Sequence, residues 1–184
     1  AGEWTGWGPM QLLGEPLQGR TLGIVGMGAI GQAVARRGKG FGMEIVYFNR
    51  NRVAPDIEAS LGAEFVSFEE LLRRSDFLSL HAPLNEHSRH LFNQQTFQLM
   101  KSTAVLVNTA RGALIDEVEL VAALRDGRLA AAGLDVYEFE PKITEGLLGL
   151  DNVVLAPHLG SASTLARGDM VRLCCENVSA VLAG

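Results

Sequence analysis

A glycine-rich turn near the start of the chain constrains the fold more than any other feature. A short apolar run at 21–25 leads directly into GMGAIG at 26–31, and a helical pattern follows. Glycines let a backbone turn sharply and approach a pyrophosphate, while a helix N-terminus presents N–H groups to it. A second apolar run at 44–48 completes a βαβ unit of about 30 residues. The pattern therefore predicts a nucleotide-binding turn rather than an ordinary glycine-rich loop.

The rest of the chain repeats this alternation of strands and helices. Further strands are expected at 62–66, 77–80, 103–107, 129–134 and 153–155. Helices are expected after the glycine turn, at 67–74, at 96–100, from Asp116 to Gly127 and at 163–182, with Ser67 and Asp116 as N-caps in capping boxes. The alternation predicts an α/β fold of the Rossmann type, a single-domain, doubly wound parallel sheet with right-handed crossovers.

The helix after the glycine turn is expected to place Ile30, Val34, Gly38 and Phe41 on one side. Two adjacent cysteines, Cys174 and Cys175, fall in the closing helix. We expect them to be small buried hydrophobic residues rather than a redox pair.

Length and charge exclude several classes of protein. A chain of 184 residues suits one domain, with 20–184 as the dinucleotide-binding domain and 1–19 as an N-terminal arm or linker. The arm holds Trp4 and Trp7, which either pack locally or dock on a partner subunit. A net charge of −5 and the lack of a Lys/Arg cluster argue against binding to nucleic acid or an anionic membrane. Without a long apolar run or a signal-peptide pattern, the protein is expected to be cytoplasmic.

Polar side chains follow the predicted strands at their C-terminal ends, where ligands bind in sheets of this kind. They are Asn49, His81, Arg111, Asp135 and His158. Each also has a purely structural interpretation: His81 could satisfy a loop, Arg111 could pair with Asp116, and His158 could cap the closing helix.

Five ordered motifs together resemble a known family. They are GMGAIG, HAPL at 81–84, NTARG at 108–112, LDVYEFEP at 134–141 and APHLGS at 156–161. In this order and spacing they resemble the NAD(P)-binding domain of the D-isomer-specific 2-hydroxyacid dehydrogenases, over essentially the whole chain.

The resemblance implies a catalytic set of Arg111, Glu140 and His158. An arginine can hold a substrate carboxylate and polarise the adjacent carbonyl. A histidinium can protonate the carbonyl oxygen as hydride arrives, and a carboxylate on its other ring nitrogen favours the charged form. The neighbouring Glu138 is interpreted as a solvated loop carboxylate. No metal site is expected, because His87 and His90 lack companion ligands.

The resemblance also implies a set of cofactor contacts. They are expected from Gly26, Gly28, Ala29, Ile30, Gly31, Asn49, Arg50, Asn51, His81, Ala82, Pro83, Ser88, Thr109, Ala110, Arg111, Asp135, His158, Gly160 and Ser161.

The end of the second strand bears on the choice of cofactor. NAD enzymes of this fold carry an acidic residue there, whereas NADP enzymes supply arginine for the extra phosphate. This chain has Asn49, followed by Arg50 and Arg52. We therefore expect NADP to be preferred, with NAD possible, unless the two arginines form only a solvated turn.

The family builds its active site between this domain and a substrate domain that is absent from the chain. We thus expect the chain to be the cofactor-binding part of a reductase of a small 2-oxo acid such as glyoxylate or hydroxypyruvate, homodimeric when complete. By itself it should bind cofactor but be nearly inactive. A formate dehydrogenase is disfavoured, since that enzyme has Gln where this chain has Glu140. The alternative from another class is a dinucleotide-sensing, corepressor-like interaction protein.

Overall fold

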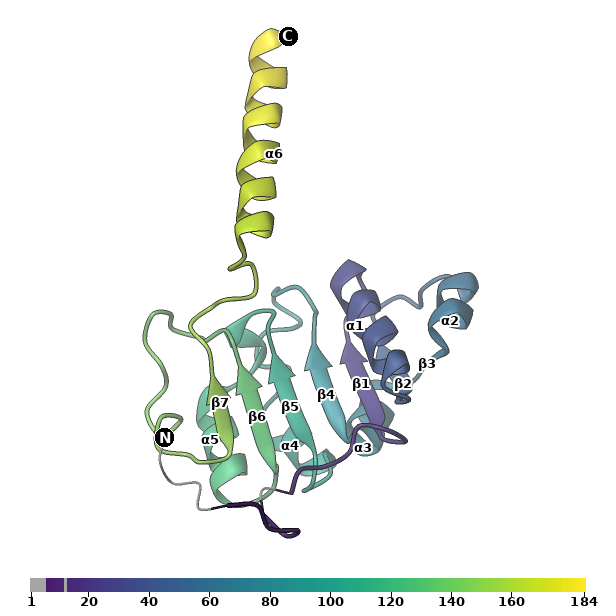
Figure 1. Ribbon diagram of the computed structural model, residues 1–184, viewed down its shortest axis with the longest axis vertical. Helices are drawn as coiled ribbons and strands as arrows, with labels where there is room; N and C mark the ends of the chain where they lie inside the picture. The colour runs from purple at the N-terminus through teal and green to yellow at the C-terminus, as the bar shows by residue number, and fades with distance from the viewer. Residues whose placement is uncertain (1–5, 12) are drawn as a thin grey trace.

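A single parallel sheet organises the protein. The computed structural model describes residues 6–11 and 13–184. Seven strands pair in the order β3-β2-β1-β4-β5-β6-β7, every neighbouring pair being parallel. The strands are β1 (Thr21–Val25), β2 (Glu44–Phe48), β3 (Ala63–Phe65), β4 (Phe77–Leu80), β5 (Val105–Asn108), β6 (Ala131–Leu134) and β7 (Val153–Leu155). Their C-terminal ends share one edge, the upper edge of the sheet in Figure 1.

The helical elements are α1 (Ala29–Gly40), α2 (Pro55–Leu61), α3 (Phe68–Arg74), α4 (Gln94–Leu99), a 3-10 turn η1 (Gly112–Leu114), α5 (Glu117–Arg125) and α6 (Thr164–Ala183). Helices α1 and α2 form one group beside this sheet, and α3, α4 and α5 form another. Helix α1 contacts α2, β1 and β2, while α4 contacts both α3 and α5. The predicted doubly wound α/β fold is confirmed.

The alternation of side chains along β1 divides the core in two. Leu22 and Ile24 pack in one cluster with Ala35 of α1, whereas Val25 belongs to a second cluster with Leu71 and other residues of the α3 side. Successive strand residues point to opposite faces, so a strand covered on both faces reads as a continuous apolar run.

Of the four residues expected to share one side of α1, only Gly38 is buried. Ile30 and Phe41 are 68% and 61% exposed, and the buried residues are Gly31, Ala35 and Gly38. A Cβ at Gly38 would lie 2.6 Å from the Leu22 side chain. The helix therefore contacts the sheet through its smallest residues, because close approach of the backbones leaves no room for larger ones.

Several element limits also differ from the sequence prediction. The third, fifth and sixth strands are shorter than expected or shifted, and α2 was not predicted. Helix α2 is only 7 residues long and begins at Pro55, a residue favoured in a first helical turn. The N-caps Ser67 and Asp116 are confirmed, since their side chains accept backbone N–H bonds from Glu70 and from Val118 and Glu119.

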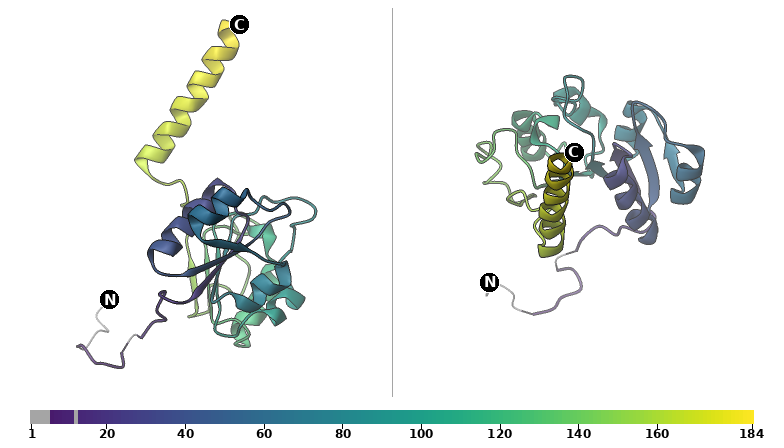
Figure 2. Two further views of the ribbon diagram at one scale, coloured as in Figure 1. Left: turned by 90° about the vertical axis from the view of Figure 1, so that its right-hand side faces the viewer. Right: turned by 90° about the horizontal axis from the view of Figure 1, so that it is seen from above.

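Helix α6 projects away from the sheet, as both figures show, and none of its residues is buried (Figures 1 and 2). The predicted burial of Cys174 and Cys175 was therefore wrong: both are exposed, because this helix has no packing partner here. Trp7 is also exposed, and Trp4 lies outside the described residues. Within the described part of the chain, no helix combines the length and apolarity that crossing a membrane requires.

Candidate active site

One cleft at the C-terminal edge of the sheet lies beside the glycine turn. We call it the glycine-loop cleft; its volume is about 730 Å³. It opens where β1 and β4 are neighbours, the point at which the strand order reverses and where ligands bind in such folds. Of the predicted contacts, it is lined by Gly26, Gly28, Asn49, Arg50, Asn51, His81, Ala82, Pro83 and Ser88.

The three glycines of the turn have different roles. Gly26 has φ +98°, and a Cβ there would lie 2.6 Å from the backbone of His81 and Ala82. A Cβ at Gly31 would lie 2.1 Å from the Gly26 carbonyl oxygen, whereas one at Gly28 would meet nothing within 4 Å. Two glycines thus allow close packing of the chain, and the third leaves space at the start of α1, where helix N–H groups can receive an anion.

Polar bonds fix the walls of this cleft. The Asn49 side-chain oxygen accepts the N–H of Met27 at 2.7 Å, which ties the end of β2 to the glycine turn. Nε2 of His81 lies 2.8 Å from Oγ of Ser79, and burial lowers the pKa of His81. The Ser88 hydroxyl donates to the Pro83 carbonyl at 2.7 Å. These side chains therefore hold loops as well as line the cleft.

The two arginines after β2 differ in what they contact. Arg52 donates two hydrogen bonds to Glu58, at 2.8 and 2.7 Å. Tyr47 also donates its hydroxyl to Glu58, and together these bonds, with that from Arg52 the largest cause, lower the pKa of Glu58 to about 2. Arg50 is exposed and makes no ion pair with any described residue. Among the described residues, Arg50 is the arginine that lines this end of the cleft, so its guanidinium is placed to meet an anion.

The second cleft, which we call the Arg111 cleft, has a volume of about 870 Å³ and is lined by Arg111, Glu140 and His158 together. Nδ1 of His158 lies 2.8 Å from Oε2 of Glu140, and the other oxygen of Glu140 accepts the N–H of Tyr137 at 3.0 Å. The bond with His158, followed by that from Tyr137, holds the pKa of the Glu140 carboxyl below its usual value. The structure thus brings the three predicted catalytic side chains to one site.

Close backbone contacts hold these three residues in place. A Cβ at Gly112 would lie 1.9 Å from the carbonyl carbon of Tyr137, so the turn that carries Arg111 packs directly on the segment after β6. The Tyr137 hydroxyl donates to the Ala156 carbonyl at 2.9 Å, just before His158. The segments that follow β5, β6 and β7 are therefore locked together.

The remaining predicted cofactor contacts line neither of these clefts. They are Ala29, Ile30, Gly31, Thr109, Ala110, Asp135, Gly160 and Ser161. The two Asp135 oxygens accept the N–H groups of Leu159 and Gly160, at 2.6 and 2.7 Å, so this carboxylate fixes the loop after β7. Contact of these residues with a cofactor stays a prediction.

The structural alternatives for Arg111 and His158 receive no support. Asp116 caps α5 instead of pairing with Arg111, whose guanidinium donates to the Ala110 carbonyl. The cap of α6 is Ser163, and His158 pairs with Glu140.

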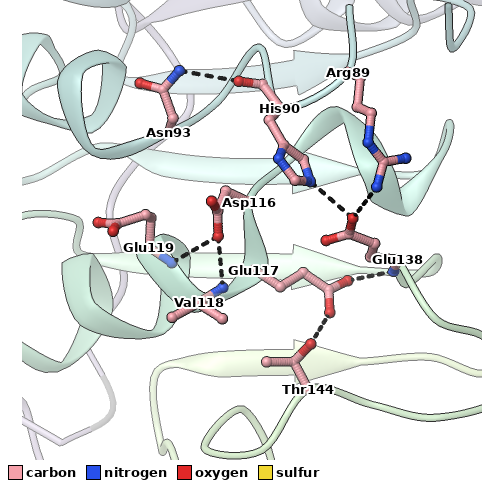
Figure 3. Close-up of polar contacts among 9 residues, drawn as sticks. All are labelled: Arg89, His90, Asn93, Asp116, Glu117, Val118, Glu119, Glu138 and Thr144. Carbon is pink, nitrogen blue, oxygen red and sulfur yellow. Dashed lines mark hydrogen bonds and ion pairs between the residues drawn. The ribbon is translucent and has the colours of Figure 1, made fainter.

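The interpretation of Glu138 as a solvated carboxylate was wrong. Its side chain is only 7% exposed and contacts Arg89 and His90 (Figure 3). Its position between the aromatic residues Tyr137 and Phe139 was a sequence signal of burial. Residues 6–11 and 13–184 contain no group of three or more His, Cys, Asp or Glu side chains arranged to hold a metal ion.

Comparison with known proteins identifies the family of the chain. The family described as "D-isomer specific 2-hydroxyacid dehydrogenase, NAD binding domain" matches residues 1–160. A glyoxylate reductase of Thermococcus litoralis is 50% identical over all of this chain and 56% of its own length. The chain thus spans about half the length of the curated relatives it matches.

Solved structures show the same likeness. A glyoxylate reductase of Paecilomyes thermophila has a TM-score of 0.86 and 48% identity, over 91% of this chain and 50% of its own. A D-isomer specific 2-hydroxyacid dehydrogenase, described as putative, from Polaromonas sp. JS6 66 has a TM-score of 0.94 and 41% identity, over 99% and 57%. The chain belongs to the D-isomer specific 2-hydroxyacid dehydrogenases, of which it forms the NAD-binding domain.

Proposed function

We propose that this chain is the cofactor-binding part of an NADP(H)-preferring reductase of small 2-oxo acids, glyoxylate or hydroxypyruvate. The observation that carries the proposal is the meeting of Arg111 with the Glu140–His158 pair in one cleft. The similarity to proteins named glyoxylate reductase supports the choice of substrate. The relatives named above are reductases or dehydrogenases, so the corepressor-like alternative gains no support.

The residues suit the reduction of a carbonyl beside a carboxylate. Arg111 can hold the carboxylate with its planar set of N–H donors and polarise the carbonyl. His158, protonated and held by Glu140 through Nδ1, can donate the proton on Nε2 to the carbonyl oxygen. When bound, the nicotinamide supplies the hydride. The product is the 2-hydroxy acid, and His158 is left neutral until it takes a proton from solvent.

The preference for NADP(H) rests on the end of β2. Asn49 takes the place of the carboxylate that would bind the ribose hydroxyls, and its oxygen is engaged by Met27. Arg50 borders the glycine-loop cleft, where it can meet a 2′-phosphate. Arg52 is paired with Glu58, so we assign contact with the 2′-phosphate to Arg50.

A steady-state assay of the full-length protein tests the proposal. NADPH and NADH are each combined with glyoxylate, hydroxypyruvate, pyruvate and 2-oxoglutarate. We expect turnover with the first two acids and a higher kcat/KM with NADPH. Equal or better use of NADH contradicts the cofactor preference, and no turnover with any of the four acids contradicts the reductase assignment.

The 184 residues alone should bind the dinucleotide but turn over little. His158 is 54% exposed, so its proton exchanges with water rather than being reserved for substrate. We also propose that the complete protein is a cytoplasmic homodimer, and α6, which exposes Leu165, Val171 and Val181, supports an interface. Rapid reduction of glyoxylate by these residues alone, or a monomer in sedimentation of the complete protein, would contradict these points.

A further inference from the structure

A buried carboxylate beside the Arg111 cleft has no role in the chemistry described above. Glu138 is two residues from Glu140 and lines the same cleft, yet its side chain is almost fully covered. Its Oε1 accepts from Nη2 of Arg89 at 2.6 Å and lies 2.8 Å from Nε2 of His90 (Figure 3). Burying a carboxylate is costly unless cations and donors compensate, so this arrangement is a built contact rather than a chance surface pair.

A second buried carboxylate, that of Glu117, forms hydrogen bonds with the segment that contains Glu138. Glu117, 2% exposed at the start of α5, accepts the backbone N–H of Glu138 at 2.8 Å through Oε1. Its Oε2 accepts the hydroxyl of Thr144. Glu117 therefore holds both ends of the segment 138–144, through Glu138 and Thr144 (Figure 3). Glu140 lies between these two residues in the sequence.

The two side chains that contact Glu138 come from the loop that borders the glycine-loop cleft. Arg89 and His90 lie in the loop after β4, and other residues of that loop, including Pro83, Asn85 and Ser88, line the glycine-loop cleft. The backbone of His90 also donates to the Ala113 carbonyl in η1, at 2.9 Å. Glu138 thus joins the loop that borders one cleft to the segment that carries the carboxylate of the other.

We propose that Glu138 is a positioning residue which, with Glu117, fixes the segment bearing Glu140 against the loop that borders the glycine-loop cleft. This inference rests on the proposed function. Glu138 acts through Glu140 and sets the aim of its carboxylate at His158. Because a displacement of about 1 Å can lower a rate by as much as a hundredfold, loss of this contact acts on the rate rather than on binding.

The test compares Glu138→Gln, Glu117→Gln and a matched control in the full-length protein. Glutamine keeps the shape of each side chain but removes its charge. The control is Glu69→Gln, which removes the carboxylate of an exposed ion pair with Arg73 on α3. For each variant we measure kcat and KM for glyoxylate, the Kd for NADPH by fluorescence and the Tm.

We expect kcat to fall by about tenfold or more in Glu138→Gln and Glu117→Gln, with KM and the Kd within about twofold of the unchanged protein. Glu69→Gln should be unaffected. An unchanged kcat overturns the inference. So does a decrease in kcat that is explained by a lower Tm and that disappears when the assay is run well below the melting range. A raised KM with unchanged kcat also overturns it, because Glu138 would then bind substrate directly.

Hydrogen exchange separates this inference from the proposed function. In the 184-residue chain, Glu138→Gln should speed exchange of amides in 138–144 by about tenfold while β1 and β4 keep their protection. If the unchanged protein reduces no 2-oxo acid, the proposed function fails, and the exchange result still decides whether Glu138 orders this segment. Unaltered exchange overturns the positioning role.

Discussion

The two clefts are built by different means. The glycine-loop cleft depends on backbone: Gly26 and Gly31 allow close approaches that no other residue permits, and one short stretch of sequence supplies them. The Arg111 cleft depends on side chains from three segments, with Arg111, Glu140 and His158 each following a different strand. A cleft that depends on glycines in one short stretch can be recognised from a local motif. A cleft that depends on side chains from separate segments forms only when the sheet brings those segments together.

The largest effect is expected in the Arg111 cleft. Replacing His158 with alanine in the full-length protein should lower kcat by about a thousandfold, since general acid catalysis contributes roughly that much. The Kd for NADPH, measured by fluorescence titration, should rise only a few-fold, because His158 is one of many expected cofactor contacts. A large loss of NADPH binding would break the distinction between the clefts, because His158 would then serve both.

Two glycines of the glycine-loop cleft allow a matched test, because a Cβ would clash with backbone at Gly26 but meet nothing at Gly28. Gly26→Ala should lower the free energy of unfolding by about 2 to 4 kcal/mol, because it forces a Cβ into the backbone of His81 and Ala82 at positive φ. Gly28→Ala should fold normally and weaken NADPH binding only. Urea unfolding and NADPH titration of both variants check this. Equal stability of the two would contradict the packing argument.

Cofactor choice should depend on one arginine. Arg50→Ala should weaken NADPH binding about tenfold and leave NADH binding unchanged, because only NADPH offers a 2′-phosphate. Arg52→Ala is the matched control: it loses its pair with Glu58 and should affect both cofactors alike. If Arg52→Ala selectively weakens NADPH, the assignment to Arg50 is wrong.

The smallest effect concerns Glu58, the carboxylate that pairs with Arg52. The pKa of Glu58 is lowered to about 2 by Arg52 and Tyr47, whereas an unfolded glutamate titrates near 4.5. A carboxyl with a lowered folded-state pKa stabilises the protein above the unfolded value, and the contribution is lost as the pH falls from about 4.5 toward 2. Glu58→Gln should therefore reduce the pH dependence of the urea midpoint across this range. An identical slope would show that the pair is not maintained in solution.

The sheet and the glycine turn were predictable because they depend on local patterns. The β-branched and aliphatic runs of β1, β2, β4 and β7 gave their limits directly, and capping residues placed the starts of α3 and α5. The buried side of α1 was not predictable from apolar residues, since contact with β1 selects Gly38 over Phe41. Likewise, nothing in the sequence shows that α6 and its two cysteines lie outside the core.

For this protein, sequence by itself determined the parallel α/β fold, the glycine turn and the residue types that suit carbonyl reduction. The family resemblance already implied that Glu140 pairs with His158, but only the tertiary structure decided that Glu138 pairs with Arg89 and His90. The physical reason is how far apart in the sequence the interacting residues lie. Periodicity and capping act between neighbours along the chain, but an ion pair between residues 49 positions apart forms only where packed strands bring their loops together.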